Sequence, residues 1–251
     1  MAAQKSWRAV PRSVLVLLLS ALLLQVAWQA SRPRAGVLAR SQALAPAPPL
    51  AALRLAALGE PVAMARLTML YAQGVDEQAG VSVAWRDLDY AVLTGWLQRV
   101  LDLDPRGQSP LLAASQVYGA VSDPVRARRM LDFVHARFAD DPNRRWPWLA
   151  HAALVARHQL HDLALARRYA RDIRLQATGP GVPSWARQMD IFMLEDMNEL
   201  DSARALIGAL LASGQVTDPR ELQFLSDRLD RLDQTVKSRQ QNTTPGRQPL
   251  L

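Results

Sequence analysis

One repeated spacing constrains the fold of this chain more than any other feature of its sequence. The pattern Asp-x-x-x-Ala occurs three times at intervals of 39 residues, each time between two apolar stretches of helical length. The three copies are Asp123/Ala127, Asp162/Ala166 and Asp201/Ala205. An Asp at the start of a helix accepts hydrogen bonds from free backbone amides, and an Ala one turn later lets a neighbouring helix approach closely. The spacing therefore predicts an array of helix-turn-helix repeats.

Prolines mark the expected breaks between these repeats. The break prolines are Pro105, Pro142, Pro183 and Pro219. Trp146 and Trp185 also lie 39 residues apart, which places them at equivalent positions in two first helices. We predict first helices over 109–120, 147–158 and 184–197, each followed by a second helix, and a terminal capping helix over 219–236.

The composition favours an all-α fold. Hydrophobic residues make up 49% of the chain and aromatic residues only 6%, so the core must consist mostly of alanine, leucine and valine. Alanine and leucine are strong helix formers, and β-branched runs bounded by turn residues are missing. The chain has no cysteine, which excludes disulfides, thiolate metal sites and cysteine nucleophiles.

Short motifs in the folded region resemble those of a known repeat family. The segment Leu101-Asp102-Leu103-Asp104-Pro105 is typical of a repeat end, and Leu112-Ala113 and Tyr118 follow it. With the small residues at Ala127, Ala166 and Ala205, these motifs make residues 50–236 similar to the tetratricopeptide-repeat (TPR) family. The resemblance implies an α-solenoid of about four helix pairs that binds a protein or peptide in its concave groove without catalysis. No consensus ligand-binding residue of the family matches this chain.

An uncharged apolar run near the N-terminus predicts a membrane anchor. Residues 13–30 form this run, and as a helix at about 1.5 Å per residue they would span roughly 27 Å, close to the hydrocarbon thickness. Trp28 lies where an interfacial aromatic residue is expected. A cleaved signal peptide is the alternative, but a cut after Ala30 would place Trp28 at a position that requires a small residue. The sequence therefore predicts a single-pass helix.

The segments around this run complete the predicted domain organisation. Residues 1–12 are a basic flank, 31–49 a Pro/Ala-rich linker, 50–236 the repeat domain and 237–251 a polar tail expected to be disordered. Lys5 and Lys237 are the only lysines among many arginines, a bias typical of GC-rich bacterial genomes. We therefore expect a protein of the bacterial inner membrane. The basic flank favours a cytoplasmic N-terminus and a periplasmic repeat domain.

The distribution of charge argues against a nucleic-acid partner. The chain carries a formal net charge of +7, but all of its 23 acidic groups lie within residues 49–236. That region has a net charge of about −2 because nine of the basic groups lie outside it. A protein that binds nucleic acid needs its basic residues on the folded face.

Two clusters are candidates for a chemical site. His151, His158 and His161 share a helical spacing that suits a metal ion, although His161 falls in a predicted turn, and solvated or capping roles fit better. Arg144-Arg145 with Trp146 and Trp148 could stack on bases and bind phosphates. The competing interpretation, a helix start whose tryptophans anchor one repeat to the next, fits a domain without basic excess better.

Arginine runs occur on the second helices and fit a solvated surface. The runs are Arg126/Arg128/Arg129 and Arg167/Arg168/Arg171, which lie near Asp132 and Asp172. No phosphate-binding glycine loop, nucleophile elbow or paired-carboxylate site is found.

Together these features predict a non-catalytic scaffold. We expect a membrane-anchored helical-repeat adaptor that binds a protein partner in the bacterial cell envelope and contacts the lipid bilayer through residues 13–30. No cofactor, metal or small-molecule substrate is expected. The alternative is a structural or accessory subunit of a larger membrane protein complex that uses the anchor helix for assembly, with Ser20, Ala21 and Ala27 as its small packing residues.

Overall fold

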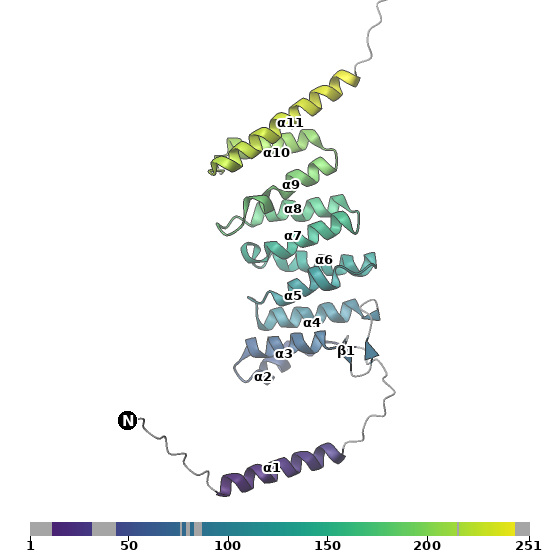
Figure 1. The fold of residues 1–251 in the computed structure, drawn as a ribbon, viewed down its shortest axis with the longest axis vertical. Coiled ribbons are helices and arrows are strands. Elements are labelled where there is room, and N and C mark those ends of the chain that lie inside the picture. The colour runs from purple at the N-terminus through teal and green to yellow at the C-terminus, as the bar shows by residue number, and fades with distance from the viewer. Residues whose placement is uncertain are drawn as a thin grey trace, which may run out of the picture. The chain divides into compact units, whose positions relative to one another are not determined.

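The computed structural model describes residues 12–31, 44–75, 77–78, 81–82, 87–214 and 216–243. It divides into two compact units, which we describe separately. Helix α1 (Arg12–Ser31) belongs to the first unit, and the helices from α2 onward belong to the second, which we call the array (Figure 1).

Helix α1 is apolar on all sides, and its leucines are exposed. Among the described residues, however, none of the helices has both the length and the apolar character needed to span a bilayer. The predicted transmembrane anchor at 13–30 is therefore wrong, as are the single-pass inner-membrane location and the periplasmic orientation that depended on it.

The array is built almost entirely of helices, so the all-α prediction is confirmed. Its helices are α2 (Leu50–Ala56), α3 (Pro61–Gln73), α4 (Tyr90–Leu103), α5 (Ser109–Leu112) with a π-helical continuation (Ala113–Tyr118), α6 (Pro124–Phe138), α7 (Pro142–His158), α8 (Leu163–Gln176), α9 (Ser184–Asp196), α10 (Leu200–Ala212) and α11 (Pro219–Thr243). The strands β1 (Glu77–Gln78) and β2 (Val81–Ser82) have two residues each.

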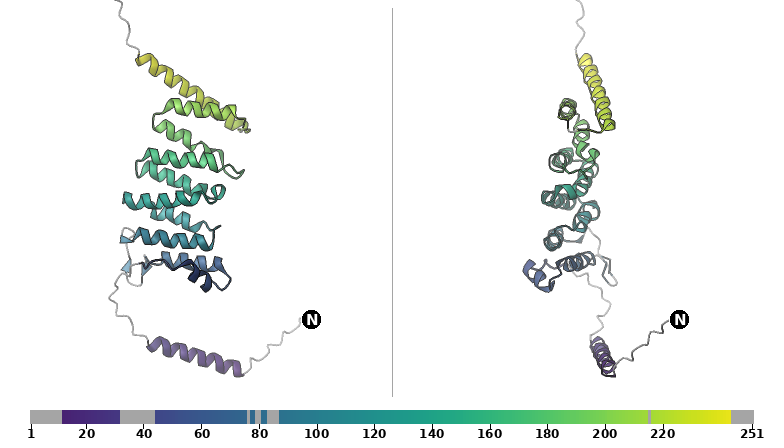
Figure 2. Two further views of the ribbon diagram at one scale, coloured as in Figure 1. Left: turned by 180° about the vertical axis from the view of Figure 1, so that it is seen from behind. Right: turned by 90° about the vertical axis from the view of Figure 1, so that its left-hand side faces the viewer.

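Consecutive helices of the array pack against one another in pairs. We call α3, α5 with its π-helical continuation, α7, α9 and α11 the first helices, and α4, α6, α8 and α10 the second helices. The right-hand view of Figure 2 shows most of these helices nearly end-on in two layers, one made of first helices and one of second helices, whereas α11 is seen along its length. Each layer therefore has its own outer surface.

The core is a row of small and aliphatic side chains between the two layers. One buried cluster runs from Leu44 to Met193, and a second involves Ile191, Leu194 and residues of α10 and α11. Fully buried alanines let the helices approach closely; they include Ala127, Ala152, Ala153, Ala166 and Ala170. The core is thus mostly aliphatic and small, as the low aromatic content indicated.

The packed part of the array begins before residue 50, within the predicted linker 31–49. Leu44 is buried, the Trp96 indole nitrogen donates to the Ala45 carbonyl at 2.7 Å, and Arg99 Nε donates to the Pro48 carbonyl at 3.2 Å. Residues 44–49 therefore pack against α4 as an extended segment. Residues 32–43 lie outside the described part of the chain.

The C-terminal helix is longer than predicted. Leu232 and Val236 are buried, as expected for a capping helix, but α11 continues to Thr243 and so includes the first residues of the predicted tail 237–251. No proline or glycine interrupts the chain until Pro245, and a helix anchored by buried leucines can continue that far. Residues 244–251 lie outside the described part.

Helix α7 also departs from the prediction, since it begins at Pro142 rather than at Pro147. Pro142 occupies the first turn, where a backbone amide would be unpaired in any case. Pro147 lies inside the helix and costs it one backbone hydrogen bond. Arg145 in the first turn makes several hydrogen bonds that hold this start in place.

We expect Gly119→Ala to lower the free energy of unfolding by about 1–3 kcal/mol. Gly119 follows the π-helical segment, and a Cβ there would lie 2.7 Å from the Ala114 carbonyl oxygen and 2.9 Å from that of Ser115. Urea unfolding followed by circular dichroism measures the change. The matched control is Gly208→Ala in the middle of α10, where a Cβ meets open space and should stabilise the helix by up to about 1 kcal/mol. Equal effects at both sites would contradict the close approach at Gly119.

Candidate functional site

The first two copies of the Asp-x-x-x-Ala pattern begin second helices. The Asp123 carboxylate accepts from the amides of Val125 at 2.9 Å and Arg126 at 3.1 Å, and it caps α6. The Asp162 carboxylate accepts from the Leu165 amide at 2.8 Å and caps α8. Ala127 and Ala166 are fully buried. These residues are structural and keep the helix layers in contact.

The third copy does not follow this pattern. Asp201 and Ala205 are both exposed on α10, whereas the helix begins after Glu199 and its buried alanine is Ala203. The turns that precede α8 and α10 explain the shift. His161 and Asn198 both have positive φ angles, of 53° and 62°, and the next residue is the N-cap in each case. The equivalent position is therefore Glu199, and the predicted register at Asp201 is wrong by two residues.

Sequence reasoning also missed an earlier cap. The Asp89 carboxylate accepts from the amides of Ala91 at 2.8 Å and Val92 at 3.2 Å, at the start of α4. Leu93 occupies the position where the other copies have alanine, and it is fully buried. The repeat pattern thus extends one copy further toward the N-terminus with a larger core residue.

The prolines and tryptophans of the pattern lie where repeats meet. Pro142 is the first residue of α7, and Pro183 is the N-cap of α9. Trp146 and Trp185 pack edge to face, with ring centroids 5.3 Å apart and an interplanar angle of 76°. Pro105 lies in the loop after α4 and contributes its carbonyl to the network described next.

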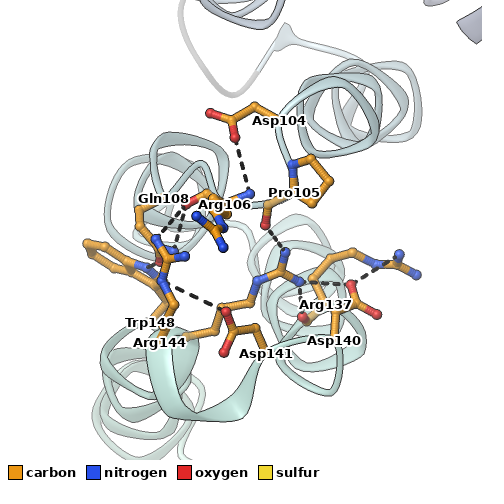
Figure 3. Close-up of polar contacts among 10 residues, drawn as sticks. Asp104, Pro105, Arg106, Gln108, Arg137, Asp140, Asp141, Arg144 and Trp148 are labelled. Atoms are coloured by element: carbon orange, nitrogen blue, oxygen red, sulfur yellow. Dashed lines mark hydrogen bonds and ion pairs between the residues drawn. The ribbon is translucent and has the colours of Figure 1, made fainter. Parts of the chain in front are cut away.

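A buried arginine joins two loops at one edge of the array. Arg145 has only 3% of its side chain exposed. Its guanidinium donates to the Pro105 carbonyl at 2.8 Å, to the Asp140 carboxylate at 2.8 Å and to the Arg137 carbonyl. Figure 3 shows Pro105, Arg137 and Asp140 converging on this point from the loop after α4 and from the end of α6. Arg145 therefore holds the start of α7 against the preceding repeat.

Neighbouring side chains of α7 make similar contacts. The Trp148 indole nitrogen donates to the Gln108 side-chain oxygen at 2.6 Å, and Arg144 donates to the Arg106 carbonyl at 3.2 Å (Figure 3). The predicted cluster of Arg144, Arg145, Trp146 and Trp148 thus makes contacts within the protein. This arrangement favours the anchoring interpretation over a patch that stacks on bases.

The charged residues of the second helices also join one repeat to the next. The contacts are Arg128 Nη1 to Asp162 Oδ2 at 2.9 Å, His135 Nε2 to Asp172 Oδ2 at 2.6 Å, the Tyr169 hydroxyl to Asp132 Oδ1 at 3.0 Å, and Arg167 Nη1 to Glu199 Oε2 at 3.2 Å. Burial, together with the Asp132 carboxylate, raises the pKa of Tyr169, so this phenol is a neutral hydrogen-bond donor. Arg129 and Arg171 are exposed on the same layer.

The histidines proposed as metal ligands are not brought together. His151 is half-buried in α7 and burial lowers its pKa, His158 is exposed, and His161 occupies the left-handed turn before Asp162. Within the described ranges there is no group of three side chains that could hold a metal ion. The His151/His158/His161 metal site is therefore not supported.

The outer surfaces of the two layers differ in character. Most of the large exposed apolar side chains of the array after α2 belong to first helices: Val62, Leu67, Leu70 and Tyr71 on α3, Leu112 on α5, Leu154 on α7, Trp185 on α9 and Phe224 on α11. The second helices contribute Val125 and Leu175. Trp146, Trp185 and Phe224 follow one another at intervals of 39 residues. We call Leu112, Leu154, Trp185 and Phe224 the first-helix row.

Comparison with protein-family models, curated proteins and solved structures gives no match for this chain. The resemblance to tetratricopeptide repeats therefore rests on the motifs quoted above and stays a prediction.

Proposed function

We propose that the array is a non-catalytic, TPR-like scaffold that binds a protein partner through its first helices. The observation that carries the proposal is the contrast between the two layers. The first helices expose leucines and aromatic residues, whereas the second helices expose mainly charged residues that already contact one another. Apolar and aromatic side chains supply most of the binding energy in protein interfaces.

The partner that fits is a protein segment with a row of apolar side chains. Leu112, Leu154 and Trp185 are 40%, 41% and 52% exposed, so each offers substantial surface for burial. They come from successive first helices, and a partner must therefore extend across several repeats. An amphipathic helix or an extended apolar strand satisfies this requirement.

Site-specific photo-crosslinking in cells that naturally produce the protein tests this proposal. A photoreactive phenylalanine analogue at Leu154 or Phe224 should yield the same crosslinked partner, whereas the analogue at Arg129 or Arg171 on the second layer should not. Mass spectrometry of the crosslink should locate it on an apolar segment of the partner. Crosslinks from the second layer alone would overturn the proposal.

A binding measurement with the identified segment provides the energetic test. Trp185→Ser and Leu154→Ser should each weaken binding at least ten-fold, which corresponds to about 1.4 kcal/mol, with melting temperatures close to that of the unaltered protein. Arg171→Ser is the matched control on the other layer and should leave the affinity unchanged. Unchanged affinity for both first-helix variants would contradict the proposed surface.

A second candidate function is that of an accessory subunit in a larger assembly. The N-terminal end of the array favours it, because Leu55, Leu67, Leu70 and Tyr71 on α2 and α3 are between 56% and 78% exposed. A solenoid end normally presents a polar outer face. In the crosslinking experiment this function predicts a partner at Leu67 and none at Trp185.

A further inference from the structure

A pocket of about 620 Å³ lies between the last helices of the array, with walls from α8, α9, α10 and α11. These helices follow one another in the stack (Figure 1). The pocket does not include Leu112, Leu154, Trp185 or Phe224, so it is separate from the first-helix row. Its three walls differ in chemistry.

The first wall is basic. It contains Arg174 from α8 and Arg187 from α9. Arg174 Nε is 3.1 Å from the carboxylate of Asp190, which is 98% buried and also lies 3.6 Å from Arg167 Nε. The charge of Arg174 is thus offset. Among the described residues Arg187 forms no ion pair, so its charge is available to a ligand.

The second wall is acidic. The Glu221 carboxylate on α11 accepts hydrogen bonds from the Gln188 side-chain amide at 2.7 Å and from the Ser184 hydroxyl. Gln188 is 94% buried and Glu221 is half-buried. Both donors are neutral, and in the described part of the chain no cation pairs with Glu221. The carboxylate is therefore fixed in position, and within the described residues no ion pair neutralises it.

The third wall is apolar. It consists of Leu175 at the end of α8, Leu210 on α10 and Val216 in the segment after α10. Leu175 has 52% of its surface exposed, so a ligand can bury part of it. One cavity thus offers a cation and an anion that form no ion pair among the described residues, together with an aliphatic surface.

We propose that this pocket binds a zwitterion with an aliphatic side chain, either a free α-amino acid or a short peptide. The ligand carboxylate pairs with Arg187, whose planar guanidinium suits a two-point contact with a carboxylate. The ligand ammonium pairs with Glu221. The side chain packs on Leu210 and Val216. A phosphate or another dianion fits poorly, because Glu221 repels it.

The probes for this proposal are L-leucine and the dipeptide Leu-Leu. Comparing their affinities shows whether the pocket prefers a free amino acid or a short peptide. Isothermal titration with the purified full-length protein should give saturable binding of at least one of them. Glycine lacks the side chain, 4-methylpentanoate lacks the ammonium group, and 3-methylbutylamine lacks the carboxylate. The reference ligand is whichever of the two probes binds more tightly. Each analogue should bind at least ten-fold more weakly than this reference.

Two variants test which residue of the pocket binds each charged group of the ligand. Arg187→Gln should weaken the binding of the zwitterion at least ten-fold and should not weaken that of 3-methylbutylamine, because this ligand has no carboxylate and its ammonium group is repelled by Arg187. Glu221→Gln retains a hydrogen-bond acceptor for Gln188. It should weaken the binding of the zwitterion and strengthen the binding of 4-methylpentanoate. Arg171→Gln, an exposed position outside this pocket, is the matched control and should have no effect. Absence of saturable binding by both probes at millimolar concentration overturns the proposal, as does equal affinity for L-leucine, 4-methylpentanoate and 3-methylbutylamine.

Discussion

Ala166→Trp should lower the free energy of unfolding of the array by about 3 kcal/mol or more, or prevent folding altogether. Ala166 is fully buried on α8, and this helix packs against both α7 and α9. A tryptophan side chain there has no space to occupy, and the helices must move apart to accommodate it. Denaturant unfolding monitored by circular dichroism measures the loss.

The third repeat provides matched controls for this result. Ala205→Trp should change the free energy of unfolding by less than about 0.5 kcal/mol because Ala205 is exposed, whereas Ala203→Trp should destabilise because Ala203 is fully buried. The two positions lie on the same helix, but Ala203 is buried and Ala205 is exposed. A larger effect at Ala205 than at Ala203 would show that the register of α10 is wrong.

Arg145→Ala should have the second-largest effect, a loss of about 2–4 kcal/mol in the free energy of unfolding. The change removes a buried guanidinium that donates to Pro105, Arg137 and Asp140, and it leaves two backbone carbonyls without these donors. Arg145→Lys should recover only part of the loss, because one ammonium group cannot span both loops.

Arg144→Ala is the control for this experiment. Arg144 is exposed, and its contacts are an ion pair with Asp141 at 3.8 Å and one hydrogen bond to the Arg106 carbonyl. Its replacement should cost less than about 1 kcal/mol. If both variants unfold at the same denaturant concentration, Arg145 does not hold the two loops together.

The elements that the sequence predicted well depend on local chemistry. A carboxylate such as Asp123 caps the helix that follows it, and an alanine such as Ala127 allows close packing one turn later. Both effects act within a few residues of the chain. The third copy was misplaced because its position depends on where the preceding turn ends. That end is set by the left-handed conformation of Asn198, and asparagine alone does not predict such a conformation at a given position.

The membrane prediction relied on apolar composition alone. Residues 13–30 are uncharged, but among the described residues no helix is both long and apolar enough to span a bilayer. The composition therefore predicted the apolar character of α1 correctly, but the membrane anchor inferred from it was wrong.

Most of the polar contacts could not be predicted from the sequence. Arg145 stands beside two tryptophans, a pattern that also suits a nucleic-acid surface, and its acceptors include the carbonyl of Pro105, 40 residues away. Arg187 and Glu221 likewise come from different helices, and no spacing relates them. Such sites are visible only when the helices have been placed side by side.

The division of the core at α9 has a consequence for how the protein opens. Met189 and Met193 of α9 face the larger cluster, whereas Ile191 and Leu194 face the smaller one formed with α10 and α11. In an array of this kind each repeat is stabilised mainly by its neighbours, so the end with the smaller core separates first. Amide hydrogen exchange should therefore be faster in α10 and α11 than in α6 to α8. Anything that bridges α8 and α11 would couple this labile end to the rest of the chain.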